Sequence, residues 1–219
     1  MTKLEILFGD ITKIKFDAIV NAANPSLLGG GGVDGAIHKA CGEKLLEECK
    51  HLNGCLIGKS KITKSYNLIE SGVYWVIHTV GPIYRNSGTE EKYLRNAYRS
   101  ALDAAANYSD YYSKQSNEIL NKNLYRFTSN GLIGSRQKES IIKDLEEYIK
   151  DHPIKTIAFP SISTGAYSYP LQDACNIVLD EILSFTKNSP DIFDEIAMVC
   201  LDEKTYNMFK SLYKERLER

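Results

Sequence analysis

The sequence predicts an α/β domain with helices on both faces of a sheet. Short apolar runs of strand length alternate with longer stretches whose apolar residues recur at helical spacing, which is the pattern of such folds. The 219 residues are enough to bury a sizeable core without a disulfide or a structural metal. This length suits one large domain or two small ones, and we expect one domain that spans residues 1–219.

In the first half of the chain, the spacing of apolar residues predicts five elements. Residues 3–9 and 17–23 are apolar and rich in β-branched side chains, so we expect them to form buried strands. At 33–50 the apolar residues recur at helical intervals, with charged residues between them, which predicts a helix. Two more strands are expected at 60–68 and 73–80, because Gly and Pro bound these apolar runs.

The second half begins with a helix at 90–108, which an acidic first turn and an apolar stripe both favour. Residues 109–136 are polar and lack a firm periodicity, so we expect a solvated loop there. This loop is an insertion rather than a domain boundary, because an amphipathic helix at 139–153 and a strand at 155–160 continue the pattern. The remaining elements are a helix near 170–187, a strand at 195–201 and a helix from about 203.

Charge and cysteine content limit the partners and the compartment. Lys and Arg number 27 against 28 Asp and Glu, a formal charge of −1, which gives no sign of a surface-wide nucleic-acid footprint. The five cysteines form no CxxC pair and lie mostly in apolar or helical contexts, as buried, reduced thiols do. The first residues lack the apolar core of a signal peptide, and no apolar run reaches membrane-spanning length. We expect a cytoplasmic monomer that does not bind membranes.

Four consecutive glycines, Gly29 to Gly32, need an explanation, because glycine loses more backbone freedom on folding than any other residue. With Gly35 they match the GxGxxG string of dinucleotide-binding domains. That fingerprint begins as a strand ends and has an acidic residue about 20 positions later, whereas here NPSLLG precedes the glycines and NGCLIG (53–58) follows. GCLIGKS (54–60) is one residue too short for a P-loop. Neither a dehydrogenase nor a P-loop NTPase is therefore favoured.

The glycines instead predict a site for an anion. They leave main-chain N–H groups unobstructed and lead into a helix near Val33, whose N-terminal N–H groups and dipole attract negative charge. A second loop, Ser163 to Gly165, likewise follows a strand and precedes a helix. Two such loops can meet beyond the carboxyl ends of parallel strands, where they would hold a diphosphate. Either loop taken alone is equally well explained as a turn.

Taken together, these stretches resemble the macrodomain family, and within it the MacroD-type hydrolases. The motifs that carry the resemblance are GDIT (9–12), DAIVNAAN (17–24), GGGGVDGAIHKACG (29–42), EC (48–49), VIHTVGP (76–82) and AFPSISTGAYSYP (158–170). They cover essentially the whole chain except about 109–150. The resemblance implies a three-layer αβα sandwich around a mixed, mostly parallel sheet. It also implies binding of ADP-ribose without a cofactor.

The resemblance implies a role for each residue of an ADP-ribose site. Asp10 would accept a hydrogen bond from the adenine amine, Ile11 would contribute main chain, and Leu201 would form an aliphatic wall where many relatives stack an aromatic ring. The diphosphate would be wrapped by Gly30, Gly31, Gly32, Val33, Ser163, Thr164, Gly165 and Ala166. Asn24 would hold the distal ribose hydroxyls, and Tyr167 would pack against the same sugar. Structural alternatives are a turn cap for Asp10, a loop side chain that bonds its own backbone for Asn24, and core packing for Tyr167.

Asp34 is the expected catalytic residue, assisted by Asn24 and Tyr167. A carboxylate that faces the distal ribose could orient or deprotonate a water for attack at the modified carbon, helped by a phosphate oxygen. The alternative for Asp34 is purely structural, since an acidic residue in the first turn stabilises a helix. We interpret His38 and His78 as structural, and no cysteine lies in a nucleophile motif. The zinc-dependent branch of the family has Cys and His ligands where this chain has glycines, so no metal is expected.

Two further departures from the family concern an edge of the sheet and the insertion. Ile57 and Ser65 replace the usual threonine and glycine in CLIGKSKITKSYNL (55–68). The insertion at 109–136 has no counterpart that we recognise in the family. Around it, aromatic and basic residues interleave as they do on nucleic-acid or protein-docking loops: Tyr108, Tyr111, Tyr112, Lys114, Lys122, Tyr125 and Arg126.

Three functions are compatible with these features. The first is a metal-independent hydrolase that removes mono-ADP-ribose from acidic side chains or deacetylates O-acetyl-ADP-ribose. The second is a reader that binds ADP-ribose without cleaving it, and the presence of both Asn24 and Asp34 favours the enzyme over it. The third is a scaffold that acts through residues 109–136. ADP-ribosylated proteins are the expected partners, and ADP-ribosylated nucleic acid is a further candidate, because the sequence leaves the cleaved linkage open.

Overall fold

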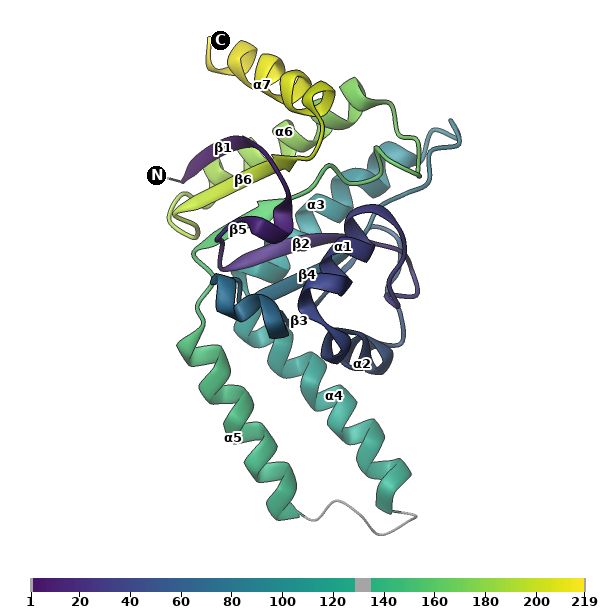
Figure 1. Cartoon of the computed structure of the whole chain (residues 1–219), viewed down its shortest axis with the longest axis vertical. Coiled ribbons are helices and arrows are strands. Elements are labelled where there is room, and N and C mark those ends of the chain that lie inside the picture. Colours follow the sequence, from purple (N-terminus) through teal and green to yellow (C-terminus); the bar gives the residue numbers. More distant parts are fainter. Residues whose placement is uncertain (1, 129–134, 219) are drawn as a thin grey trace.

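A computed structural model of the chain describes residues 2–128 and 135–218 (Figure 1). Within these residues the chain forms a six-stranded sheet in the order β1-β6-β5-β2-β4-β3. The strands are β1 (Lys3–Phe8), β2 (Ala18–Ala23), β3 (Ser60–Lys64), β4 (Trp75–Val80), β5 (Thr156–Phe159) and β6 (Glu195–Cys200). Neighbouring strands are parallel except β3 and β4, which run antiparallel. The predicted mixed, mostly parallel sheet is therefore confirmed.

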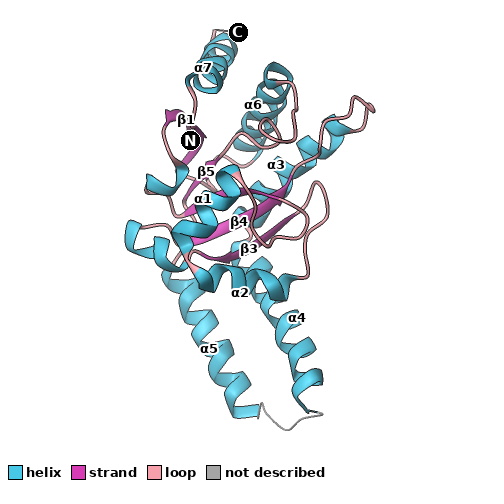
Figure 2. Ribbon diagram, turned by 45° about the vertical axis from the view of Figure 1, so that its right-hand side comes forward, coloured by secondary structure: helices cyan, strands magenta, loops and turns pink. Residues whose placement is uncertain are grey.

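Helices on both faces of the sheet complete the predicted αβα sandwich (Figure 2). One face is covered by α1 (Gly32–Cys41) and α2 (Glu43–Leu52), which share a buried apolar cluster with it. The other face carries α3 (Glu90–Ala106), α6 (Leu171–Asn188) and α7 (Glu203–Leu217), which belong to a second buried cluster. The predicted fold class is therefore confirmed.

The four inner strands, β2, β4, β5 and β6, are mostly apolar because both of their faces are buried. In β2, Ala18 and Val20 belong to the cluster under α3 and α6, whereas Ile19 belongs to the cluster under α1 and α2. Successive side chains of a strand point to opposite faces, so a single strand contributes to both cores.

The predicted bounds of two elements differ from those in the structure. The expected helix at 33–50 is broken at Gly42, which has a φ of 81° and whose Cβ would lie 2.6 Å from Asn67 Nδ2. That left-handed conformation ends α1 and begins α2. The strand expected at 60–68 ends at Lys64, and a 3-10 helix, Tyr66–Ser71, follows it. Tyr66 leaves the strand conformation, with a φ of 52°.

The expectation of a loop at 109–136 is wrong where the structure describes it. α4 (Tyr108–Thr128) and α5 (Ser135–Asp151) lie side by side and extend away from the sheet (Figures 1 and 2). Residues 129–134 of the predicted insertion lie outside the described residues. The side chains of Lys122, Tyr125 and Arg126 are also outside the description, so their predicted part in a docking loop stays a prediction.

A narrow buried stripe explains why this polar segment is helical. Tyr112 and Ser116, one helical turn apart, are both buried on α4. The Tyr112 ring packs edge-on against Trp75, with 4.9 Å between ring centroids, and its hydroxyl donates a hydrogen bond of 2.9 Å to Glu48 Oε1. About one residue in each turn of α4 is buried, so the mostly polar sequence shows no clear helical periodicity.

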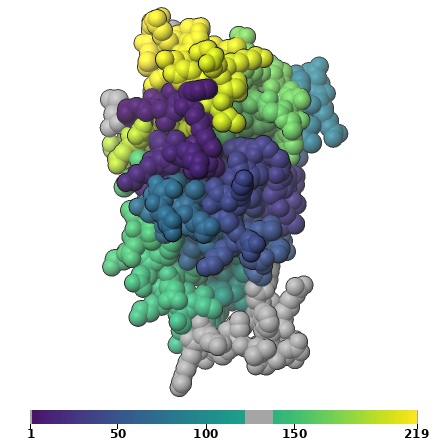
Figure 3. All heavy atoms as spheres, in the orientation of Figure 1, coloured from purple at the N-terminus to yellow at the C-terminus, as the bar shows by residue number. Residues whose placement is uncertain are grey.

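The last helix of the chain covers the first strand. α7 contacts β1, and Figure 3 shows the yellow C-terminal residues lying against the purple N-terminal ones. No helix among the described residues is long and apolar enough to cross a membrane.

Candidate functional site

The residues singled out in the sequence gather at one edge of the sheet. Because β1, β6, β5, β2 and β4 run parallel, their carboxyl ends lie together at that edge. Asp10 follows β1, Leu201 follows β6, the 160–167 loop follows β5, and Asn24 follows β2. The residues therefore lie along the edge in the order of the strands, not in the order of the chain.

The winding of the sheet reverses between β5 and β2. From β2 the chain passes through α1 and α2 to β3 on one side, whereas from β5 it passes through α6 to β6 on the other. Open α/β sheets bind ligands at such a reversal, just beyond the carboxyl ends of the strands. The start of α1 and the 160–167 loop flank this position.

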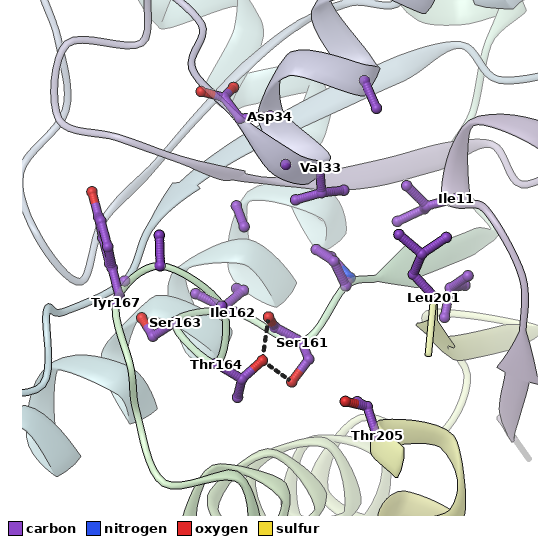
Figure 4. Close-up of a pocket in the computed structure, with 18 of the residues that line it drawn as sticks. Ile11, Val33, Asp34, Ser161, Ile162, Ser163, Thr164, Tyr167, Leu201 and Thr205 are labelled. Carbon is purple, nitrogen blue, oxygen red and sulfur yellow. Dashed lines mark hydrogen bonds between the residues drawn. The ribbon is translucent and has the colours of Figure 1, made fainter. Parts of the chain in front are cut away.

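A cavity of about 580 Å³ opens at the reversal (Figure 4). Every binding or catalytic residue predicted from the sequence lines it: Asp10, Ile11, Asn24, Gly30, Gly31, Gly32, Val33, Asp34, Ser163, Thr164, Gly165, Ala166, Tyr167 and Leu201. In Figure 4, Ile11 and Leu201 lie together at one end, whereas Asp34 and Tyr167 lie on the opposite side. The structure thus brings the predicted residues together, and the ligand atoms that each would contact stay a prediction.

The glycine loop and the start of α1 form one wall of this cavity. Gly32 has a φ of 59°, a left-handed value that glycine adopts without strain. Gly31 is the N-cap residue of α1, and its position provides no side-chain cap. The free N–H groups of an uncapped first turn attract anions, so this wall suits a phosphate group.

A methyl group at Gly35 is expected to disturb this wall, because Cβ would lie 2.5 Å from the Gly30 carbonyl oxygen. We expect Gly35→Ala to lower the free energy of unfolding by about 1–3 kcal/mol, the usual cost of overpacking. The control is Gly31→Ala, whose Cβ would meet open space and which should cost under about 1 kcal/mol. Chemical denaturation measures both, and equal losses would contradict tight packing of α1 on the loop.

Asp34 joins the loop to the core of the site. Its side chain is only 5% exposed although it lines the cavity. Oδ1 accepts a hydrogen bond of 2.7 Å from Asn21 Nδ2 and lies 3.5 Å from His38 Nε2, while Oδ2 lies 3.4 Å from Asn24 Nδ2. Burial raises the pKa of Asp34, and the Asn21 hydrogen bond and the His38 charge oppose that rise. A carboxylate with a raised pKa that faces a cavity is suited to take a proton.

Asn24 holds the loop as well as the carboxylate. Its Oδ1 accepts hydrogen bonds from the Ser26 N–H (2.9 Å) and hydroxyl (2.6 Å), and its Nδ2 donates to the Gly29 carbonyl at 2.8 Å. The local hydrogen bonding that the sequence offered as an alternative is therefore present. It fixes the amide beside Asp34.

The opposite wall is the 160–167 loop. Ser163 adopts a φ of 68°, uncommon for a residue with a side chain, and its buried Oγ lacks a hydrogen-bond partner among the described residues. Thr164 Oγ1 donates to the Ser161 carbonyl oxygen at 3.1 Å. Tyr167 lies across the cavity from Asp34 (Figure 4), and burial, then the Asp34 charge, raises the pKa of its phenol. A strained turn with an unpaired hydroxyl is the kind of feature found at ligand sites.

The far end of the cavity combines one acidic and two aliphatic side chains. Asp10 Oδ1 accepts hydrogen bonds from the Thr12 N–H (2.9 Å) and hydroxyl (2.8 Å), so Asp10 is the cap that the structural alternative describes. Its Oδ2 accepts no hydrogen bond within the described part of the chain. Leu201 is 72% exposed and lies beside Ile11, so this end can cover the face of a planar ring.

Comparison with known proteins gives the family. The model of the Macro domain matches residues 20–110 and 130–178. The chain belongs to the Macro domain family. A Macro domain-containing protein of Methanosarcina mazei is 37% identical over 95% of this chain and 86% of its own length. The mouse ADP-ribose glycohydrolase MACROD1 is 35% identical over 98% of this chain, which spans 51% of that longer protein.

Solved structures agree with this assignment. A point mutant of the Oceanobacillus iheyensis macrodomain with ADPR superposes with a TM-score of 0.72 at 32% identity, covering 99% of this chain and 94% of that one. The predicted family is confirmed, as is the similarity to MacroD-type proteins.

Behind Asp34 this macrodomain carries a buried polar chain that sequence reasoning missed. Asn21 Nδ2 also lies 3.1 Å from His78 Nδ1, and His78 Nε2 lies 3.0 Å from Thr63 Oγ1. All three side chains are fully buried, and burial lowers the pKa of His78 to about 3, so its imidazole is neutral. Because Asn21 donates to Nδ1, the His78 proton is on Nε2 and points to Thr63. A polar Asn and His inside otherwise apolar strands were the available signal.

One group of side chains in the described part of the macrodomain has the composition of a metal site. His38, Cys49 and His78 each place a ligand atom within 4.8 Å of the others. His78 Nε2 is already engaged by Thr63, and burial raises the pKa of Cys49 to about 12, which keeps the thiol protonated. Metals bind the thiolate, so this group fits a hydrogen-bonded core better than a metal centre. The expected absence of a metal stays a prediction.

Proposed function

We propose that this macrodomain is a metal-independent hydrolase that removes mono-ADP-ribose from acidic side chains of proteins or deacetylates O-acetyl-ADP-ribose. The observation that carries the proposal is the position of Asp34. Its carboxylate is held by Asn21, with Asn24 beside it and Tyr167 across the cavity. ADP-ribosylated nucleic acid is a further candidate substrate, and we expect the protein to act as a monomer in the cytoplasm.

The strand order suggests how ADP-ribose would lie. Adenine would occupy the end between Asp10 and Leu201, at β1 and β6. The diphosphate would cross the reversal between β5 and β2, where the glycine loop and the 160–167 loop offer main-chain N–H groups. The distal ribose would then reach Asn24, Asp34 and Tyr167. A cavity of about 580 Å³ falls in the usual range for small-molecule sites.

Asp34 would act on a water at the distal ribose. The water oxygen forms a bond to the modified ribose carbon, the bond from that carbon to the ester oxygen breaks, and the acidic side chain leaves as a carboxylate. Asp34 orients the water and takes its proton, or a phosphate oxygen of the substrate takes it. Asn24 holds the ribose hydroxyls, and Tyr167 fixes the tilt of the sugar.

The names of relatives support a hydrolase, since MACROD1 is an ADP-ribose glycohydrolase. A reader that binds ADP-ribose without cleaving it is the second candidate. The two candidates share the diphosphate loops. Asp34 favours the enzyme because its carboxylate lines the cavity, is held in place by Asn21 and lies beside Asn24, the arrangement that a general base needs.

A panel of linkages tests the proposal. The protein is incubated with a substrate mono-ADP-ribosylated on Glu, with O-acetyl-ADP-ribose and with a nucleic acid ADP-ribosylated on a terminal phosphate, each with and without a chelator. We expect chelator-resistant release of ADP-ribose from at least one ester. Tight binding of ADP-ribose by calorimetry, without release from any substrate, would make the protein a reader.

The raised pKa of Asp34 has a consequence for pH dependence. The ionised carboxylate is the active form, so the rate should fall about tenfold per pH unit below the pKa of Asp34. This acid limb should lie above the ordinary aspartate pKa, because burial raises it. Asn21→Ala removes the hydrogen bond that favours the carboxylate and should move the limb to higher pH. A kcat/KM profile measures both, and an unchanged limb in Asn21→Ala would contradict this role of Asn21.

A further inference from the structure

A second cavity lies farther along the same edge of the sheet. It has a volume of about 730 Å³ and is lined by Pro25, by the loop before β3, which includes Leu56 and Lys59, and by Tyr111 and Lys114 of α4. Because β3 is antiparallel to β4, the start of β3 lies at the edge where the parallel strands end. The cavity therefore continues the row of strand ends that forms the proposed ADP-ribose site.

One loop contributes to the lining of both cavities. Asn24 lines the first and Pro25, the next residue, lines the second. The Cys55 N–H donates a hydrogen bond of 2.9 Å to the Pro25 carbonyl oxygen, which ties the 24–28 loop to the loop before β3. Two strand spacings separate β2 from β3, a distance of ~10 Å. An extended chain of about three residues spans that distance.

The direction in which ADP-ribose would lie along the strand ends indicates which part of the substrate would reach the second cavity. In the proposed binding mode, ADP-ribose begins at β1 and β6 and ends with the distal ribose at β2. The group to which ADP-ribose is attached extends from that ribose, and the next positions along the edge are β4 and β3. The molecule released from ADP-ribose would therefore lie over the second cavity.

The side chains around the second cavity indicate what kind of molecule would bind there. Leu56 is 77% exposed and its neighbour Ile57 is 43% exposed, so an apolar contact is available. Lys59 and Lys114 are exposed and make no ion pair with the described side chains, while Lys61 donates to the Leu52 carbonyl oxygen at 2.6 Å. Apolar and cationic groups together match a polypeptide that carries both apolar side chains and carboxylates.

Given the hydrolase activity proposed above, we propose that this second cavity is a docking site for the modified polypeptide, with an acidic segment near the ADP-ribosylated side chain on Lys59 and Lys114. A nucleic acid fits less well, because its phosphate backbone offers no apolar group to the exposed Leu56 that also lines the cavity. α4 supplies Lys114, so the segment without a recognised family counterpart contributes to the choice of substrate (Figure 1).

The test compares binding of two ligands to the wild-type protein. One is free ADP-ribose, and the other is a peptide of acidic residues and leucines joined to ADP-ribose through a hydrolysis-resistant linkage. We expect the peptide conjugate to bind at least about tenfold more tightly than ADP-ribose alone. In Lys59→Glu/Lys114→Glu that advantage should disappear, while the affinity for free ADP-ribose stays within about twofold of wild type.

A matched charge reversal controls for net charge. Lys155 and Lys187 are exposed residues that precede β5 and end α6, at the opposite edge of the sheet, and Lys155→Glu/Lys187→Glu should retain the advantage of the conjugate. Equal affinities for the two ligands in the wild type would overturn the docking site and leave the hydrolase intact. If an ADP-ribosylated oligonucleotide bound more tightly than the peptide conjugate, the docking site would be one for nucleic acid and the proposed polypeptide ligand would be wrong. If the wild-type protein bound neither free ADP-ribose nor the peptide conjugate, both the proposed function and the docking site would be overturned.

Discussion

Asp34→Ala should lower the turnover of an ADP-ribosyl ester about 10²–10⁴-fold, the usual contribution of a positioned acid or base. The affinity for ADP-ribose should be largely retained, because the diphosphate loops keep their main-chain N–H groups. The expected signature is therefore a loss in kcat with a nearly unchanged dissociation constant for ADP-ribose. Turnover assays and calorimetry on one preparation measure the two quantities.

Asp34→Asn separates the charge from the shape of the side chain. The amide has nearly the same volume and can still accept the hydrogen bond from Asn21, so the fold should be undisturbed. Because burial disfavours the carboxylate, its removal should not lower the free energy of unfolding by more than about 1 kcal/mol. Full turnover by Asp34→Asn would contradict a role for the ionised group.

Trp75→Ala should lower the free energy of unfolding by about 3–5 kcal/mol, the usual cost of truncating a buried Trp. Trp75 is fully buried, packs edge-on against Tyr112 and Tyr148, and donates a hydrogen bond of 2.7 Å from Nε1 to the His152 carbonyl oxygen. It therefore joins β4 to both α4 and α5. Without the Trp75 side chain, α4 and α5 should detach from the sheet before the rest of the structure unfolds.

The measurement for Trp75→Ala is chemical denaturation followed by circular dichroism, because Trp75 is the single tryptophan of the chain and its fluorescence is lost. Tyr93→Ala on α3 is the control, since Tyr93 is 41% exposed and should cost under about 1 kcal/mol. Trp75 begins β4, at the edge opposite the proposed site, so ADP-ribose binding should survive wherever Trp75→Ala stays folded. A loss equal to that of Tyr93→Ala would contradict the role of Trp75 as an anchor.

The sheet and the first site residues could be predicted because their signals are local. β2 is buried on both faces and is apolar except for Asn21. The four consecutive glycines are costly in backbone entropy, which drew attention to their loop. The loops at the ends of β2 and β5 could be paired because parallel strands bring their carboxyl ends together. The resemblance to macrodomains then gave each position a proposed role.

The features that sequence reasoning missed depend on contacts between distant residues. Asn21 and His78 lie on neighbouring strands, and only the register that places them opposite each other turns two core residues into a support for Asp34. Helix α4 was missed because most of its residues are polar. Few of them are buried against the rest of the protein, as Tyr112 is against Trp75 and Glu48. The second cavity likewise needs Leu56 and Lys114, which no local pattern connects.

The central claim is that this macrodomain cleaves ADP-ribose from an ester, and a single-turnover time course tests it most directly. Wild-type protein is placed in excess over a substrate mono-ADP-ribosylated on Glu, with a chelator present, and released ADP-ribose is followed. We predict complete release in one exponential phase, because binding sites exceed substrate and product release cannot limit the signal. Substrate that stays bound and uncleaved through the time course would contradict the hydrolase and identify a reader.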